Sequence, residues 1–140
     1  MAEIPQNPLS EVSANDATGV TLEIYRSIEA ALGVRLVNLV YRHLATKPGA
    51  LEWAWGVVGE GFSNGAYGQR SALLTEMAAG SSVGREVVGT ISLAAAGLNS
   101  VETSAVIETL DAYNRANPMN AVSLRVIALA LREGLSLIHI

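Results

Sequence analysis

Helical spacing of apolar residues in almost every segment is the feature that most constrains this chain. Apolar side chains recur three and four positions apart, which is the period of one helix face, and strand-like alternation is scarce. Leu51, Trp55, Val58 and Phe62, for example, follow the spacing i, i+4, i+7 and i+11. The pattern predicts an all-α fold with essentially no sheet, in a single domain of about six or seven short helices.

Start and stop signals give the expected helix boundaries. Asp16 is a plausible N-cap for a first helix that Gly33 ends, and Asn99 with Glu102 resembles a capping box. The pair Asn117-Pro118 is typical of a helix start, because proline is favoured in the first turn. We therefore expect helices over about 17–32, 35–46, 48–62, 68–79, 85–96, 99–113 and 118–133.

The composition indicates a folded protein and excludes several classes of partner. A length of 140 residues suits one domain, and 50% hydrophobic with only 16% charged residues argues against disorder. Because the chain is so apolar, we expect part of its apolar surface to be covered by a partner or by a missing half of the protein. The net charge of −4, without a basic run, gives no footprint for nucleic acid. No apolar stretch approaches the ~20 residues of a membrane span, and no signal peptide is visible, so we expect a cytoplasmic protein with no membrane partner.

The two ends differ in character from the middle of the chain. Residues 1–15 are polar and contain prolines, which predicts a loose lead-in. Residues 135–140 read LSLIHI after a glycine and resemble a translated adapter tail rather than native sequence. We therefore expect a helical unit over 16–134, and a natural protein that continues beyond it.

General catalytic templates find little support. The chain has no cysteine, which excludes disulfides and thiolate chemistry. Its two histidines are His43 and His139, and the second lies in the tail. One histidine does not make a metal site or a catalytic triad, so we expect His43 to be a hydrogen-bonded histidine in or at the edge of the core.

Asn117 is the most informative polar residue. If it begins a helix, free N–H groups and the positive end of the helix dipole lie beside its amide. Such a place attracts a carboxylate, a halide ion or a polarised water. Taken alone, the same residues are better explained as helix punctuation with no catalytic role.

Two segments resemble a known family. Residues 32–49 with 51–55 (LGVRLVNLVYRHLATKPG, then LEWAW) and residues 110–118 (LDAYNRANP) are similar to the first repeat of the group I 2-haloacid dehalogenases. These proteins are also named halocarboxylic acid dehydrogenases. The likeness spans roughly residues 18–133, and the order and separation of both segments fit.

The resemblance implies an all-α protein of two tandem repeats related by a pseudo-twofold axis. The active site would lie between the repeats and use no cofactor and no metal. Water would attack C2 of a 2-haloalkanoic acid directly, releasing halide and a 2-hydroxy acid. An Asp of the second repeat would act as the base. The asparagine that helps hold the water matches Asn117.

The resemblance also implies pocket residues, and here the chain departs from the family. The matched positions are Leu36, Asn38, Leu39 and Asn120. The family has aromatic residues where this chain has Leu36 and Leu39. It has a small residue at the position of Asn38 and a tyrosine at the position of Asn120. A pocket built from this chain would therefore be less aromatic and more polar.

These observations predict half of a dehalogenase-like hydrolase that binds a small halocarboxylic acid and needs a second repeat. The isolated chain would be inactive, because the catalytic Asp lies outside it. An alternative is a non-catalytic helical module that dimerises through its apolar face or binds a small carboxylate at Asn117. A third class, the alkylhydroperoxidase-D and carboxymuconolactone-decarboxylase enzymes, has similar small helical domains. The absence of a Cys-x-x-Cys pair removes its peroxidase version.

Overall fold

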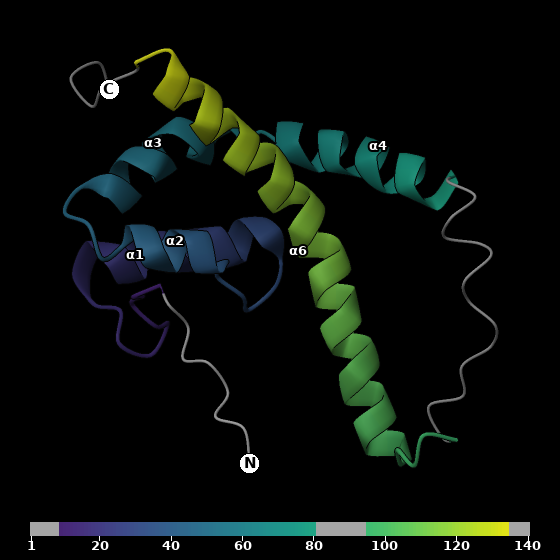
Figure 1. Cartoon of the computed structure of the whole chain (residues 1–140). Coiled ribbons are helices and arrows are strands. Elements are labelled where there is room, and N and C mark those ends of the chain that lie inside the picture. The colour runs from purple at the N-terminus through teal and green to yellow at the C-terminus, as the bar shows by residue number, and fades with distance from the viewer. Residues whose placement is uncertain (1–8, 81–94, 135–140) are drawn as a thin grey trace.

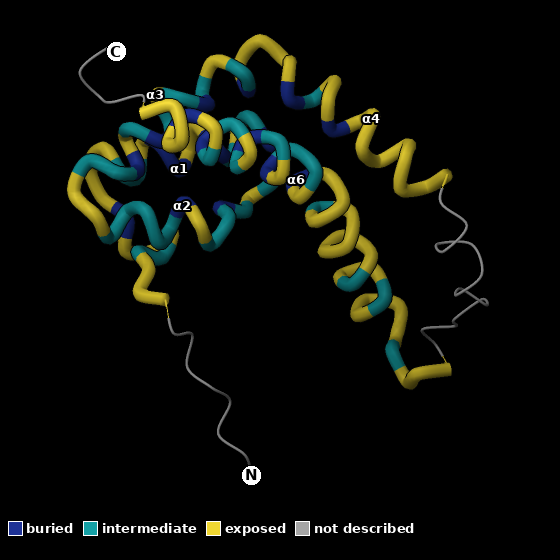
Figure 2. The backbone as a smooth tube through the Cα atoms, turned by 45° about the horizontal axis from the view of Figure 1, so that its top comes forward, coloured by how far each residue is buried: buried dark blue, intermediate teal, exposed yellow. Residues whose placement is uncertain are grey.

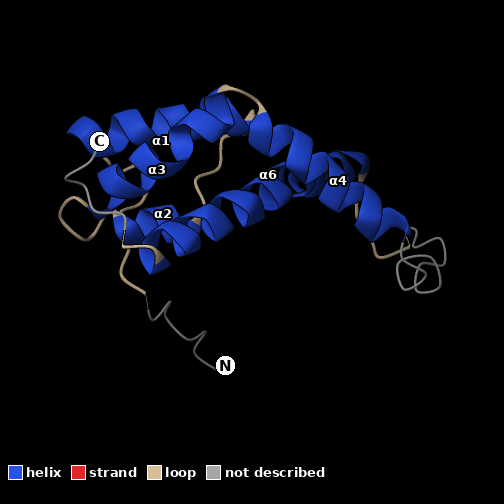
Figure 3. Cartoon of the chain, turned by 90° about the horizontal axis from the view of Figure 1, so that it is seen from above, coloured by secondary structure: helices blue, strands red, loops and turns tan. Residues whose placement is uncertain are grey.

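A computed structural model describes residues 9–80 and 95–134, and in these ranges the ordered structure is helical (Figure 3). The predicted all-α fold is confirmed. The described residues contain five helices and no strand: α1 (Gly19–Leu32), α2 (Leu39–Leu44), α3 (Ala50–Ser63), α4 (Ala66–Gly80) and α6 (Ser100–Arg132). The helix expected over 85–96 and the tail 135–140 lie outside or largely outside the described residues.

Residues 100–132 form one helix rather than two. Asn99 begins α6 with the predicted capping box, and the helix continues for 33 residues with Pro118 inside it. The prediction that Asn117-Pro118 begins a new helix is therefore wrong. Residues of α4 and residues of α6 on both sides of the proline, from Tyr113 to Ala121, line one groove. Continuing the helix through Pro118 gives up the backbone hydrogen bond that another residue would donate to the carbonyl of Asn114.

Other boundaries show which local signals are used. Gly33 ends α1 in the left-handed region with φ 65°, as expected, and its N–H donates to the carbonyl of Glu29. Asp16 is not the N-cap of α1, because it instead forms a local turn in which the Ser13 hydroxyl donates to its carboxylate at 2.6 Å. α2 is shorter than predicted because the side chain of Asn38 caps it, accepting from the N–H of Val40 at 3.0 Å.

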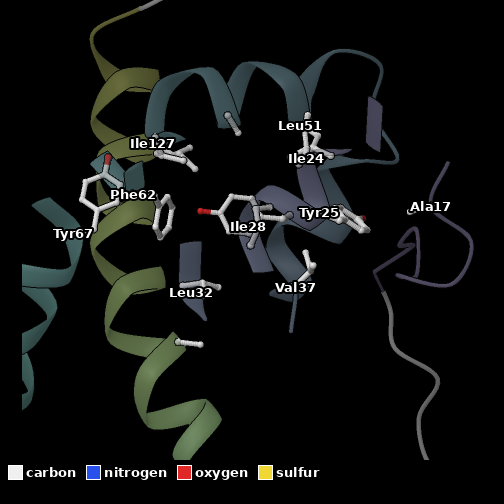
Figure 4. Close-up of a cluster of buried hydrophobic side chains, with 14 residues drawn as sticks. Ala17, Ile24, Tyr25, Ile28, Leu32, Val37, Leu51, Phe62, Tyr67 and Ile127 are labelled. Carbon is white, nitrogen blue, oxygen red and sulfur yellow. The ribbon is translucent and has the colours of Figure 1, made fainter. Parts of the chain in front are cut away.

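The core lies between α1, α2, α3 and the C-terminal half of α6, with one aromatic residue from α4 (Figure 4). On α3 the buried stripe is Leu51, Ala54, Val58 and Phe62, while Trp55 is half-buried and stacks on the Phe62 ring with 5.6 Å between centroids. Tyr67 of α4 meets the Phe62 ring edge-on at 5.0 Å. This aromatic contact ties the beginning of α4 to the body of the protein.

Residues 10–12 are attached to the helical body. The Tyr25 hydroxyl donates to the carbonyl of Val12 at 2.9 Å, and the N–H of Val12 donates to the carbonyl of Arg42. The Nδ1 atom of His43 lies 2.7 Å from the carbonyl oxygen of Ser10. His43 is thus a hydrogen-bonded, half-buried histidine as predicted. The loose lead-in expected over 1–15 does not hold for this part of it.

α4 and the N-terminal half of α6 extend away from the core and diverge from each other (Figure 1). Most of their surface is exposed (Figure 2). Every buried residue of α6 lies at position 116 or later. Large apolar side chains are exposed on both helices, namely Leu73, Leu74, Met77, Val101, Ile107, Leu110, Tyr113, Leu129 and Leu131. Among the described helices, none has the length and the apolar character needed to cross a membrane.

Candidate functional site

Asn117 lies in the interior of α6, on its exposed side. α6 begins at Ser100, so the free N–H groups and the positive dipole end expected beside Asn117 are elsewhere. Any ligand at Asn117 would meet the side-chain amide and not a helix N-terminus. The reason is the continuation of the helix through Pro118.

Asn117 does lie in a depression, which we call the amide groove. This groove has a volume of about 610 Å³ and runs between α4 and α6. Asn114 and Asn117 are three residues apart on the helix, so their amides share one face. The lining residues are Leu74, Thr75, Ala78, Ala79, Tyr113, Asn114, Asn117, Pro118 and Ala121. Four of these, Tyr113, Asn114, Asn117 and Pro118, belong to the second segment that resembles the dehalogenases.

The amide groove can orient a polar molecule but offers it no base. The side-chain amides of Asn114 and Asn117 each supply donors and an acceptor, and the surrounding walls are mostly apolar. No carboxylate or imidazole is among the lining residues in the described part of the chain. Within the described parts of the chain, no three His, Asp or Glu side chains come together in a way that could hold a metal ion.

Leu36, Asn38 and Leu39 do not line the amide groove. All three are half-buried, and the side-chain oxygen of Asn38 is occupied in capping α2. The loop before them is fixed to α6 by Arg115, whose guanidinium donates to the carbonyl of Gly33 at 3.2 Å. Positions 115 and 117 point about 200° apart around a helix, at 100° per residue. The predicted patch of Asn117 with Leu36 and Leu39 is therefore not what surrounds Asn117.

Asn120 belongs to the core and not to an open pocket wall. It is 3% exposed, and neither polar atom of its side chain has a hydrogen-bond partner among the described residues. One turn further, the Ser123 hydroxyl donates to the backbone carbonyl of Asn120 and lies 2.8 Å from the Tyr41 hydroxyl. Burial raises the pKa of Tyr41 above its usual value, although the hydrogen bond with Ser123 acts in the opposite direction.

A second groove, missed by sequence reasoning, lies on the other side of the contact between α4 and α6. We call it the arginine groove. Its volume is also about 610 Å³, and it shares only Leu74 and Ala121 with the amide groove. Its lining is Ala66, Tyr67, Arg70, Leu73, Leu74, Met77, Ala121, Val122, Arg125 and Val126. The sequence signal was present, because Arg70, Leu73, Leu74 and Met77 have the spacing i, i+3, i+4 and i+7.

Comparison of the chain with protein-family models, curated proteins and solved structures gives no match. We therefore infer its function from the side chains that line the two grooves and from the segments 32–55 and 110–118. The first of these segments forms α2 and the beginning of α3, and the second crosses the middle of α6. The second segment contributes four residues to the amide groove, and the first contributes none to it.

Proposed function

We propose that this chain is the first repeat of a two-repeat hydrolase of the 2-haloacid dehalogenase type. The amide groove carries the proposal, because the segment 110–118 that resembles the family also lines the groove. The groove is open toward solvent and mostly apolar, which suits a site completed by a second repeat. Its substrate would be a small 2-haloalkanoic acid.

The proposed reaction is a displacement at C2. The oxygen of a water molecule forms a bond to C2 while the carbon–halogen bond breaks, so halide leaves with the bonding electrons. The proton of the water must go to a base at about the same time. Asn117 is suited to hold the water in line with C2, since an amide can both donate and accept. It does not take up a proton near neutral pH, so a carboxylate of the second repeat must act as the base.

The test is halide release from 2-chloropropionate. We expect the purified 140-residue chain to release no halide above background, since no base lines the amide groove. In a protein that carries both repeats, Asn117→Ala should lower kcat by roughly 10²-fold or more, as for loss of one preorganised group. Gln69→Ala is a matched control, because Gln69 carries an exposed amide on α4 outside both grooves.

Two outcomes would count against this proposal. If Asn117→Ala and Gln69→Ala had the same small effect, Asn117 would have no part in the reaction. If the short chain itself released halide and Asn117→Ala abolished it, a single repeat would suffice and the half-site would be wrong. Circular dichroism of each variant shows whether the helical fold is kept.

The exposed apolar surface favours a second candidate function, a non-catalytic module that associates through α4 and α6. Met77 is 73% exposed and Val101 is 77% exposed, which is unusual for large apolar side chains. An interface that covered them would stabilise the extended half of the protein. For this candidate to hold, the chain must associate through α4 and α6. The protein that contains both repeats must also release no halide.

A further inference from the structure

The arginine groove combines an apolar floor with two cationic groups. Arg70 comes from α4 and Arg125 from α6, and both side chains are exposed. Neither forms an ion pair with another described residue. No Asp or Glu of the described residues lines the groove, although acidic residues outnumber basic ones in the whole chain, 13 to 9. The groove is therefore a local positive site on a protein of net negative charge.

The two arginines come from different helices, and apolar lining residues precede and follow each of them along its helix. α4 begins beside the C-terminal half of α6 and leads away from it (Figure 1). On α4, Leu73, Leu74 and Met77 follow Arg70 and line the same groove as Arg125. Seven residues of helix separate Arg70 from Met77, a length of about 10 Å.

We propose that the arginine groove binds an amphiphilic carboxylate, with the carboxylate between Arg70 and Arg125 and the alkyl chain along the apolar floor. Guanidinium groups bind carboxylates through paired hydrogen bonds, and two of them in one groove favour an acidic head. The alkyl chain would cover Leu73, Leu74 and Met77, which are 52%, 44% and 73% exposed. The volume of about 610 Å³ lies within the usual range for small-molecule sites.

A second copy of the chain is a weaker candidate for this groove. In a twofold contact the same surface meets itself, so the groove would have to supply its own counter-charge. It has no acidic residue with which to do so. A carboxylate ligand supplies that charge directly. This inference does not rest on the proposed hydrolase, because it uses different polar residues on the opposite side of the contact between α4 and α6.

The test compares ligands that share one alkyl chain. Titration calorimetry of the 140-residue chain with decanoate, decanol and decyl phosphate, each below its micelle concentration, separates the head from the tail. We expect decanoate to bind at least about 10-fold more tightly than decanol, which corresponds to about 1.4 kcal/mol. Its affinity should fall as salt rises, because the head-group contact is electrostatic and exposed.

Variants then place the ligand in the groove. Arg70→Gln/Arg125→Gln should reduce decanoate affinity to that of decanol and leave decanol binding unchanged. Arg132→Gln removes an exposed arginine from α6 outside the groove and should leave both affinities unchanged. Met77→Glu should weaken decanoate and decanol alike, since it places a charge on the apolar floor.

Several results would overturn the inference. Equal binding of decanoate and decanol, or decanoate binding that survives the double arginine variant, would remove the carboxylate site. Tighter binding of decyl phosphate than of decanoate would assign the head to a phosphate instead. The groove would be assigned to self-association if three results came together. The chain would dimerise, its Arg70→Gln/Arg125→Gln variant would stay dimeric, and neither form would bind decanoate.

Discussion

The hydroxyl groups of Tyr41 and Ser123 meet at 2.8 Å inside the core and connect α2 to α6 across 82 positions of sequence. Both side chains are almost completely buried. Ser123 also donates to the carbonyl of Asn120, so its oxygen is best placed to accept from Tyr41. The Tyr41 hydroxyl therefore donates to Ser123, and Ser123 donates to the carbonyl of Asn120. Loss of the Tyr41 hydroxyl and loss of the Ser123 hydroxyl should change the stability by different amounts.

We expect Ser123→Ala to destabilise the protein more than Tyr41→Phe does. Removing Ser123 leaves the Tyr41 hydroxyl buried without its partner, at a cost of about 1–3 kcal/mol, whereas Tyr41→Phe removes one hydrogen bond worth about 0.5–1.5 kcal/mol. Urea unfolding of both single variants and the double variant gives the three free energies of unfolding. The double variant should lose less than the sum of the singles. Strict additivity would contradict a direct hydrogen bond.

At the scale of whole elements, local signals predict helix existence well and helix continuity badly. The capping box at Asn99 and the glycine stop at Gly33 lie where the sequence places them, because cap geometry depends only on neighbouring residues. The prediction at Pro118 is wrong, because Asn-Pro occurs both at helix starts and inside longer helices and the local pattern does not distinguish the two.

Pro118→Ala provides a test of this continuous helix. Within a helix, alanine restores the hydrogen bond to the carbonyl of Asn114 and removes the ring clash, so the free energy of unfolding should rise by up to about 3 kcal/mol. At a helix start the same substitution would be close to neutral or unfavourable. Urea unfolding followed by circular dichroism distinguishes the two. An unchanged or lower stability would show that α6 is broken at this point.

Gly61 and Gly68 form a matched pair on neighbouring helices. A Cβ at Gly61 would overlap the ring of Tyr67, whereas one at Gly68 would meet nothing within 4 Å. Gly61→Ala should therefore destabilise the protein by about 1–3 kcal/mol in spite of its better helix propensity. Gly68→Ala should stabilise it by about 0.5–1 kcal/mol. Thermal unfolding of both variants is sufficient, and a stabilised Gly61→Ala would mean that α4 does not pack through Tyr67.

For the molecule as a whole, the sequence predicted the all-α class because 3.6-residue periodicity is a property of each segment alone. The site was harder to predict, because a groove is created by two segments that are distant in sequence. Asn117 was expected beside Leu36 and Leu39, but the apolar residues that line its groove come from α4 and α6. Asn120 was expected in a pocket wall, yet its position on the buried stripe of α6 directs it into the core.

The exposed apolar surface also predicts how the chain behaves in solution. We expect the 140-residue chain to self-associate, because large apolar side chains of α4 and α6 are left uncovered. Leu110→Glu/Val101→Glu should shift the population toward monomer, since both residues are exposed and neither belongs to the core or lines the arginine groove. Light scattering over a range of concentrations measures this. A monomer at high concentration of the unmodified chain would show that the surface needs no partner.

The uneven burial of α6 means that one continuous helix spans two regimes of local stability. Its 33 residues extend for about 50 Å, yet only the part from Ala116 onward is anchored in the core. Backbone amides of that part can exchange with solvent only when the core itself opens. Those nearer Asn99 are protected by the cap and the helix ladder alone, and exchange through fraying. Pro118 contributes no N–H, so the ladder is interrupted between the two regimes, and opening of the outer half need not propagate into the core.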